Sequence, residues 1–223
     1  MSRIHTLTTL RRCAAQGMPF GKAVAARKGE LQKKSAQNFL ADNQESAMNW
    51  QKLESTALII VKKTLQDLSV EHPDEHFYAC ALYTDSSAMT MAVAVNSVEA
   101  LEVKLEEEGK EEREELMPYY KWVSSEWKYQ AWKGEYFKDI CEALRVANER
   151  SDISSFKENL NSLMTDVLNT LRKDGVFRFF KVQEPILFVT VTDDDGAERL
   201  ENKTAEMLNS SEKYEYFLRR FDG

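Results

Sequence analysis

Apolar residues recur with helical spacing in three long segments of the chain. From Ser46 they repeat every three or four residues until Pro73, which predicts a helix over residues 46–72. The same spacing predicts helices over residues 137–144 and 156–171, and Gly175 follows the second of these where a C′ glycine ends a helix. Residues 197–223 predict one or two closing helices.

Other segments have the pattern of strands. HFYACALYT, residues 76–84, is apolar on both alternating sets, which is typical of a strand covered on both faces. A DSS turn and the apolar residues 88–96 follow, so a hairpin is expected, and Ser97 is placed to cap a helix starting at Val98. Residues 186–192 predict a further strand, and VFRFFKV, residues 176–182, is open between strand and loop. We therefore expect an α+β domain over residues 46–223, with a small, mostly antiparallel sheet of three to four strands flanked by helices.

Charge divides the chain into two parts. Residues 1–40 contain eight basic residues and one acidic residue, a net charge of +7, so the remainder carries −14 of the total of −7. Residues 1–45 are weakly patterned, with a short helix predicted before a Gly- and Pro-containing break and a second helix over residues 22–40 after it. The sequence thus predicts a helical, basic N-terminal extension followed by an acidic domain.

Cysteine usage and hydropathy indicate the compartment. Cys13, Cys80 and Cys141 are odd in number and widely spaced, which is typical of free thiols in a reducing cytoplasm. No apolar run approaches the roughly 20 residues that span a bilayer, so no membrane partner is expected.

The segment PYYKWVSSEWKYQAW, residues 118–132, contains six aromatic residues. We expect Ser124 or Ser125 to cap a helix that continues to residue 144. At about 100° per residue, Trp127 lies beside the apolar stripe of that helix and Trp132 lies well away from it. The two cannot both face one core, so Trp132 should be covered by another element of the chain, which we favour, or by a partner.

Few side chains suggest catalysis or metal binding. EHPDEH, residues 71–76, and the acidic residues Asp193–Asp195 favour polar turns over metal sites, because Pro73 interrupts helical ligand spacing and consecutive strand residues face alternate sides. Glu126 is better explained as an acid in the first turn of a helix than as a catalytic acid. The acidic run over residues 106–115 indicates a solvated helix end or loop, or else a docking surface. No phosphate-binding or nucleophile motif occurs, so we expect no cofactor, no metal and no enzyme.

Several motifs together resemble a known family. FYACALYTD, then a strand ending VAVN, then YYKWVSSEWKY and a late ILFVTVTDDD strand occur in the order found in the bacterial domain-of-unknown-function family 4303. The resemblance covers roughly residues 46–195, and Tyr119 to Trp127 is its most specific part. It implies a small cytoplasmic protein, and some members look like immunity proteins in toxin loci. The basic extension falls outside this pattern.

The leading hypothesis is an immunity protein that neutralises a cognate protein toxin through an acidic, aromatic-rich surface. The residues expected on that surface are Glu107, Glu111, Glu112, Glu115, Trp122, Glu126, Trp132, Asp193 and Asp195. The alternative is an enzyme of unrecognised class that uses Glu126 and Asp193–Asp195. Nucleic-acid binding by the extension is disfavoured, because the acidic domain repels the same polyanion. The extension could instead pack on the acidic surface of its own chain or of a second subunit, which leaves a homo-oligomer open.

Overall fold

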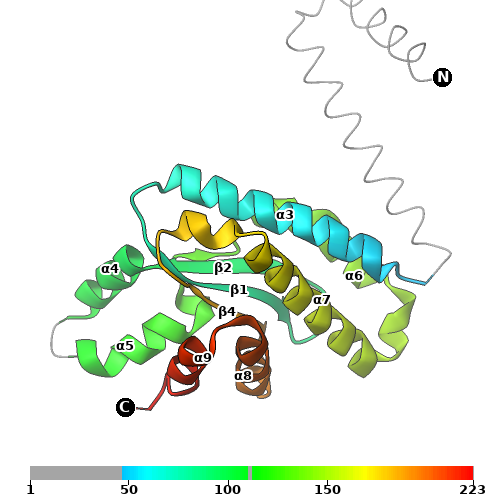
Figure 1. Ribbon diagram of the computed structural model, residues 1–223. Helices are drawn as coiled ribbons and strands as arrows, with labels where there is room; N and C mark the ends of the chain where they lie inside the picture. The colour runs from blue at the N-terminus through cyan, green and yellow to red at the C-terminus, as the bar shows by residue number, and fades with distance from the viewer. Residues whose placement is uncertain (1–46, 110–111, 223) are drawn as a thin grey trace, which may run out of the picture. The chain divides into compact units, whose positions relative to one another are not determined.

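The computed structural model describes residues 47–109 and 112–222, so the predicted extension at residues 1–45 lies outside the described residues. These residues form a sheet between helices (Figure 1). The helices are α3 (Trp50–Glu71), α4 (Val98–Glu108), α5 (Arg113–Trp122), α6 (Lys138–Val146), α7 (Ile153–Lys173), α8 (Ala197–Leu208) and α9 (Ser211–Leu218). The strands are β1 (Phe77–Asp85), β2 (Ala92–Ser97), β3 (Tyr129–Gln130) and β4 (Ile186–Thr192). Short 3₁₀ helices are η1 (Ser124–Glu126), η2 (Gly134–Phe137), η3 (Asn148–Ser151) and η4 (Val176–Phe180). None of the helices in the described ranges is both long and apolar enough to cross a bilayer.

The sheet has the strand order β3-β2-β1-β4. β1 pairs antiparallel with β2, and β2 pairs antiparallel with β3. β1 also pairs in parallel with β4, from Ala79 opposite Ile186 to Asp85 opposite Thr192. Antiparallel pairing therefore predominates, which confirms the α+β class and the small four-stranded sheet.

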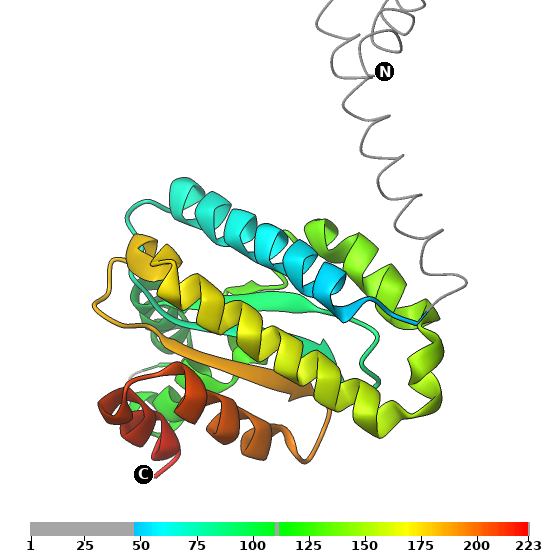
Figure 2. The same ribbon diagram turned by 45° about the vertical axis from the view of Figure 1, so that its right-hand side comes forward.

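Helices cover both faces of the sheet. α3 and α7 lie side by side across one face in Figures 1 and 2. On the other face, small residues of the central strands leave room for large rings from α5, β4 and α9 and for Trp127, which follows η1. This cluster comprises Ala79, Ala81, Ala94, Trp122, Trp127, Ile186, Phe188, Ala205 and Phe217. The ring of Phe188 lies 4.9 Å from that of Phe217 and 5.7 Å from that of Trp127, measured between centroids. Each such ring buries roughly 150–250 Å², so these contacts dominate the packing of this face.

Helix α8 closes the outer edge of β4. The backbone N–H of Val189 donates to Thr204 Oγ1 at 2.9 Å, and the N–H of Leu187 donates to Asn209 Oδ1 at 2.9 Å. Asn209 Nδ2 donates in return to the carbonyl oxygen of Leu187 at 2.7 Å. An edge strand with unpaired N–H and C=O groups is a template for intermolecular pairing, and these two side chains occupy that template.

The long helices begin and end where the sequence predicts. Asn49, Ser97 and Asp152 each accept a hydrogen bond from a backbone N–H three residues further on, as N-caps do. α3 ends just before Pro73. Gly175 follows α7 with φ of +70°, a left-handed conformation that suits glycine. The helices expected after Ser46, after Ser97 and over residues 156–171 are confirmed.

Two local predictions are refined. The second strand begins at Ala92 rather than Ala88, because the Asp85 carboxylate holds the preceding residues in a turn. It accepts hydrogen bonds from the N–H of Ser87 at 2.9 Å and from Thr90 Oγ1 at 2.6 Å. The VFRFFKV segment is neither a strand nor a simple loop, since most of it forms the 3₁₀ helix η4.

The helix predicted from Ser124 to residue 144 is wrong in its first half. η1, β3 and η2 occupy this stretch, and α6 begins only at Lys138. Ala131 and Lys133 have φ of 51° and 50°, which no helix tolerates. The physical reason is that Trp127 and Tyr129, only two residues apart, are both buried by distant parts of the chain: Trp127 packs against Phe188, and Tyr129 donates to Glu75. Those tertiary contacts override the helical periodicity.

Candidate functional site

Helices α4 and α5 form an acidic hairpin beyond one end of the sheet (Figure 1). Leu101 and Leu105 are buried and anchor α4. Arg113 forms an ion pair with Glu102, and the Tyr120 hydroxyl donates to Glu108 Oε1 at 2.7 Å, so the two helices are tied together along their length. The hydrogen bond to Glu108 raises the pKa of Tyr120 to about 12. We call this pair of helices the acidic hairpin.

Residues 99–115 include nine acidic and three basic residues, a net charge of −6. In the described part of this stretch, several carboxylates are exposed and have no ion pair with another described residue. They are Glu106, Glu107, Glu112, Glu114 and Glu115. Because these like charges lie on the same two helices and face solvent, the hairpin generates a negative potential that attracts cations.

Glu126 lies beside the acidic hairpin. Tyr119 donates to Glu126 Oε1 at 3.1 Å, and Glu107 and Glu126 line the same hollow of about 220 Å³. The structure thus brings Glu107, Glu112, Glu115 and Glu126 to one region of the molecule. Glu111, also expected there, lies outside the described residues.

The two expected surface tryptophans take other positions. Trp122 is 4% exposed and packs against Tyr78 and Phe217, so its assignment to a partner-binding surface is wrong. Its ring belongs to the hydrophobic core next to the C-terminal end of α5. Trp132 is half-buried, and its ring lies 5.2 Å from those of His72 and Tyr129, so elements of its own domain cover it in part.

Asp193–Asp195 lie far from the acidic hairpin. All three are exposed, and Asp194 Oδ1 accepts from the N–H of Gly196 at 2.8 Å just before α8. They follow β4 at the end of the sheet where Asp85 of β1 pairs with Thr192. The hollow beside Glu126 is lined by Asn96, which pairs with Ala79 at the opposite end of β1. Six residues of β1 separate the two ends, or roughly 20 Å at about 3.3 Å per residue. The structure therefore does not bring Glu126 and Asp193–Asp195 together around one reacting atom.

A hydrogen-bonded cluster that the sequence did not reveal surrounds Glu75. Its Oε1 accepts from the Tyr129 hydroxyl at 2.5 Å and from Lys128 Nζ at 2.9 Å, and Ser97 Oγ donates to Oε2. Burial by itself raises the pKa of Glu75, but these hydrogen bonds outweigh it and lower the pKa below its ordinary value of 4.5. Burial, together with the bond to Glu75, raises the pKa of Tyr129 to about 12. The cluster joins the start of β1 to β3. Its feature in the sequence is the polar segment EHPDEH, which contains Glu75.

The histidines of EHPDEH have separate partners. His76 Nδ1 lies 2.6 Å from Glu99 Oε1, whereas His72 packs its ring on Tyr129 at 4.8 Å. Within residues 47–109 and 112–222, no group of three or more His, Cys, Asp or Glu side chains is placed to hold a metal ion.

Comparison with known proteins identifies a family. The family model described as domain of unknown function DUF4303 matches residues 56–210. No curated protein matches the chain, and no solved structure does. The matched range begins within the first third of α3, ends just before α9 and includes every strand of the sheet. The chain is therefore a member of the DUF4303 family.

Proposed function

We propose that this chain is a bacterial cytoplasmic binding protein that neutralises a cognate protein toxin by covering a basic surface of the toxin with the acidic hairpin. The observation that carries the proposal is the set of five exposed carboxylates on α4 and α5 that have no ion pair with another described residue. A toxin that acts on nucleic acid needs a basic cleft to hold phosphates, and a negative surface is complementary to such a cleft.

The acidic hairpin also offers apolar surface among its charges. Val103 is 56% exposed and Tyr119 is 45% exposed. Tyrosine is enriched in the parts of interfaces that contribute most to affinity, because it combines apolar area with a hydroxyl group. We infer that charge accelerates the encounter and that these two side chains slow dissociation.

The hairpin is pre-organised for binding. The ion pair between Glu102 and Arg113 and the Tyr120–Glu108 hydrogen bond fix the relative positions of its helices in the free protein. Lys104 Nζ also lies 3.3 Å from Glu108 Oε1. A surface that is already ordered loses less conformational entropy when it binds, which favours tight association.

Co-expression with the product of the neighbouring gene tests the proposal. We expect the partner to copurify and its toxicity to be suppressed. The triple variant Glu107→Lys, Glu112→Lys and Glu115→Lys should weaken binding by at least about 100-fold, since each reversed charge opposes the basic partner. A matched control reverses three exposed acids on α7 and α8, Glu158, Glu198 and Glu206, with the same change in net charge. If both triple variants bind alike, or if nothing copurifies and no toxicity is suppressed, the proposal fails.

A further inference from the structure

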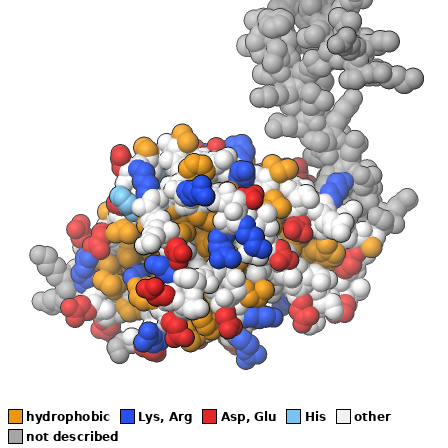
Figure 3. All heavy atoms as spheres, in the orientation of Figure 1, with side chains coloured by type: hydrophobic (Ala, Val, Ile, Leu, Met, Phe, Trp, Pro, Cys, Tyr) orange, Lys and Arg blue, Asp and Glu red, His pale blue; other side chains and the backbone are white. Residues whose placement is uncertain are grey.

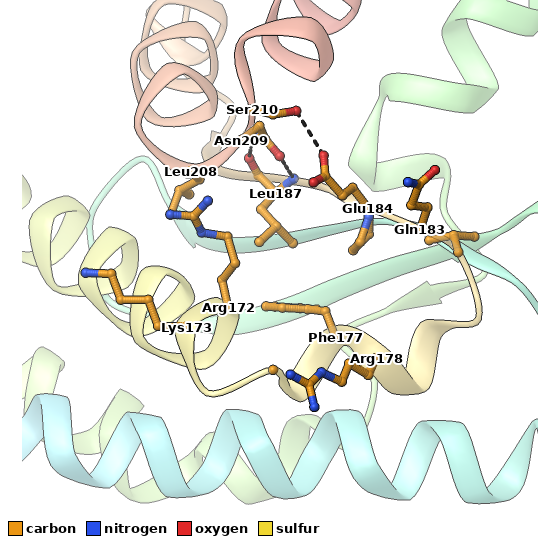
Figure 4. A pocket seen from close by; sticks show the side chains of 13 residues that line it. Arg172, Lys173, Phe177, Arg178, Gln183, Glu184, Leu187, Leu208, Asn209 and Ser210 are labelled. Atoms are coloured by element: carbon orange, nitrogen blue, oxygen red, sulfur yellow. Dashed lines mark hydrogen bonds between the residues drawn. The ribbon is translucent and has the colours of Figure 1, made fainter.

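A cleft of about 440 Å³ opens between the end of α7, η4, the segment before β4 and the turn between α8 and α9 (Figure 4). We propose that this cleft binds a small anionic ligand, a carboxylate or phosphate that carries an apolar group. The proposal is independent of the acidic hairpin, because none of the residues that line the cleft belongs to α4 or α5.

The cleft concentrates positive charge in an acidic part of the chain. Arg172, Lys173 and Arg178 line it, although residues 41–223 carry a net charge of −14. None of the three forms an ion pair with a carboxylate of the described residues. Arg172 Nη2 donates to a neutral group, Asn169 Oδ1, at 3.2 Å. Their charges are therefore available to an anion, and guanidinium groups bind carboxylates and phosphates through paired hydrogen bonds.

The lining includes one carboxylate. Glu184 Oε2 accepts from Ser210 Oγ at 2.9 Å, on the wall opposite Arg172 in Figure 4. One carboxylate against three cations leaves the cleft with a net positive charge. In Figure 3, Lys and Arg side chains also gather near the middle of the face shown, beside hydrophobic atoms.

The floor of the cleft is apolar and held in place. Phe177 is 6% exposed, and Leu187 and Leu208 are buried. Asn209 fixes the adjoining wall through its paired hydrogen bonds to the backbone of Leu187. A concave site with an apolar floor and a few convergent polar groups is the form that small-molecule sites take, and its volume lies within the range of about 300–1,000 Å³ for such sites.

Gly175 permits the position of Arg178. A Cβ atom at Gly175 would lie 2.9 Å from Arg178 Nε, so the absence of a side chain at Gly175 leaves room for the guanidinium group over this turn. In Figure 4, Phe177 lies between Arg172 and Arg178. Two cations thus flank an aromatic ring, an arrangement suited to a ligand whose apolar part rests on the ring while its charge reaches either arginine.

Titration of the full chain with a fluorescent anilinonaphthalene sulfonate tests the site, since this probe joins an anion to an apolar ring system. We expect saturable binding with one probe per chain. Arg172→Gln and Arg178→Gln should each weaken it about tenfold, the loss of one charge-assisted contact. Arg199→Gln removes an exposed cation of α8 that does not line the cleft, and should leave binding unchanged.

Competition identifies the ligand chemistry. Naphthalene carboxylate should displace the probe, and neutral naphthalene methanol should do so at least about tenfold more weakly. The acidic-hairpin triple variant should bind the probe normally, which separates this proposal from the proposed function. Equal urea midpoints for the variants would show that each is folded. Binding that survives both arginine substitutions, or the absence of saturable binding, would overturn the proposal.

Discussion

The hydroxyl of Thr204 should stabilise the domain far more than that of an equally buried threonine elsewhere. Thr204 is 3% exposed, and its Oγ1 accepts from Val189 N–H on the outer edge of β4. Thr204→Val keeps the shape of the side chain but leaves that N–H without a partner in a buried site. The cost of one buried, unsatisfied donor is about 1–3 kcal/mol.

Thr64 on α3 is the matched control. It is 0% exposed, and its hydroxyl donates at 2.8 Å to the carbonyl oxygen of Ile60, one turn back in the same helix. That carbonyl lies inside α3, so it keeps its helical N–H partner when the hydroxyl is lost. We therefore expect Thr64→Val to change the free energy of unfolding by less than about 0.5 kcal/mol.

Urea denaturation followed by tryptophan fluorescence measures both changes. With a slope of about 2 kcal/mol per molar urea, a loss of 2 kcal/mol moves the midpoint by about 1 M. Hydrogen exchange adds a local readout, because the Val189 amide should lose protection in Thr204→Val and keep it in Thr64→Val. Equal midpoint shifts in the two variants would refute the idea that α8 stabilises β4 by satisfying its edge.

Three further predictions concern single residues. Glu75→Gln should destabilise the domain by about 1–3 kcal/mol at pH 7 through weaker hydrogen bonds. The pKa of Glu75 in the folded state lies below its ordinary value of 4.5, so the ionised carboxylate stabilises the folded state fully above pH 4.5. This stabilisation is lost as the pH falls through the lowered pKa, and the urea midpoints of wild type and variant should therefore converge in acid. Gly175→Ala should lower the free energy of unfolding by about 1 kcal/mol, because φ is +70° at this position, and should displace Arg178. The variant should therefore have a lower urea midpoint and bind the probe more weakly, and unchanged values of both would contradict the prediction. Cys80 is buried, which keeps reagents from its thiol and raises the pKa of that thiol. Iodoacetamide should therefore label Cys80 at the rate of global unfolding and the half-buried Cys141 sooner. Peptide mass spectrometry distinguishes the two labelled cysteines.

The elements that could be predicted are those whose own residues determine them. α7 has an apolar stripe that begins after an Asp cap and ends before Gly175, so local periodicity and local termination agree. β1 is apolar on both sides because helices cover both faces of the central strand. The exposure of Glu112 and Glu115 was also predictable, since a block of like charges stays in solvent.

The aromatic segment could not be predicted, because distant residues determine its conformation. The Tyr129 hydroxyl donates to Glu75, 54 residues away, and the ring of Trp127 lies 5.7 Å from that of Phe188 on β4. Helical propensity differs among residues by tenths of a kcal/mol, whereas a buried hydrogen bond to a charged group contributes about 1.5–3 kcal/mol. Because the tertiary hydrogen bonds outweigh the propensities, a two-residue strand and a 3₁₀ helix replace the helix that periodicity favours.

The cationic cleft could not be predicted from the sequence for a different reason. The net charge of a long segment averages basic and acidic residues that the fold places on different surfaces. The basic residues of the cleft and Phe177 lie close together in the sequence around Gly175, but the rest of its apolar floor comes from Leu187 and Leu208, on elements further along the chain. In the sequence, Arg172 and Lys173 look like ordinary cations in the last turn of a helix, where they favour the helix dipole. The return of β4 and α8 beside this turn completes the apolar floor next to those cations. The same folding carries the acidic hairpin to a separate surface, so one chain of moderate net charge presents two surfaces of opposite sign.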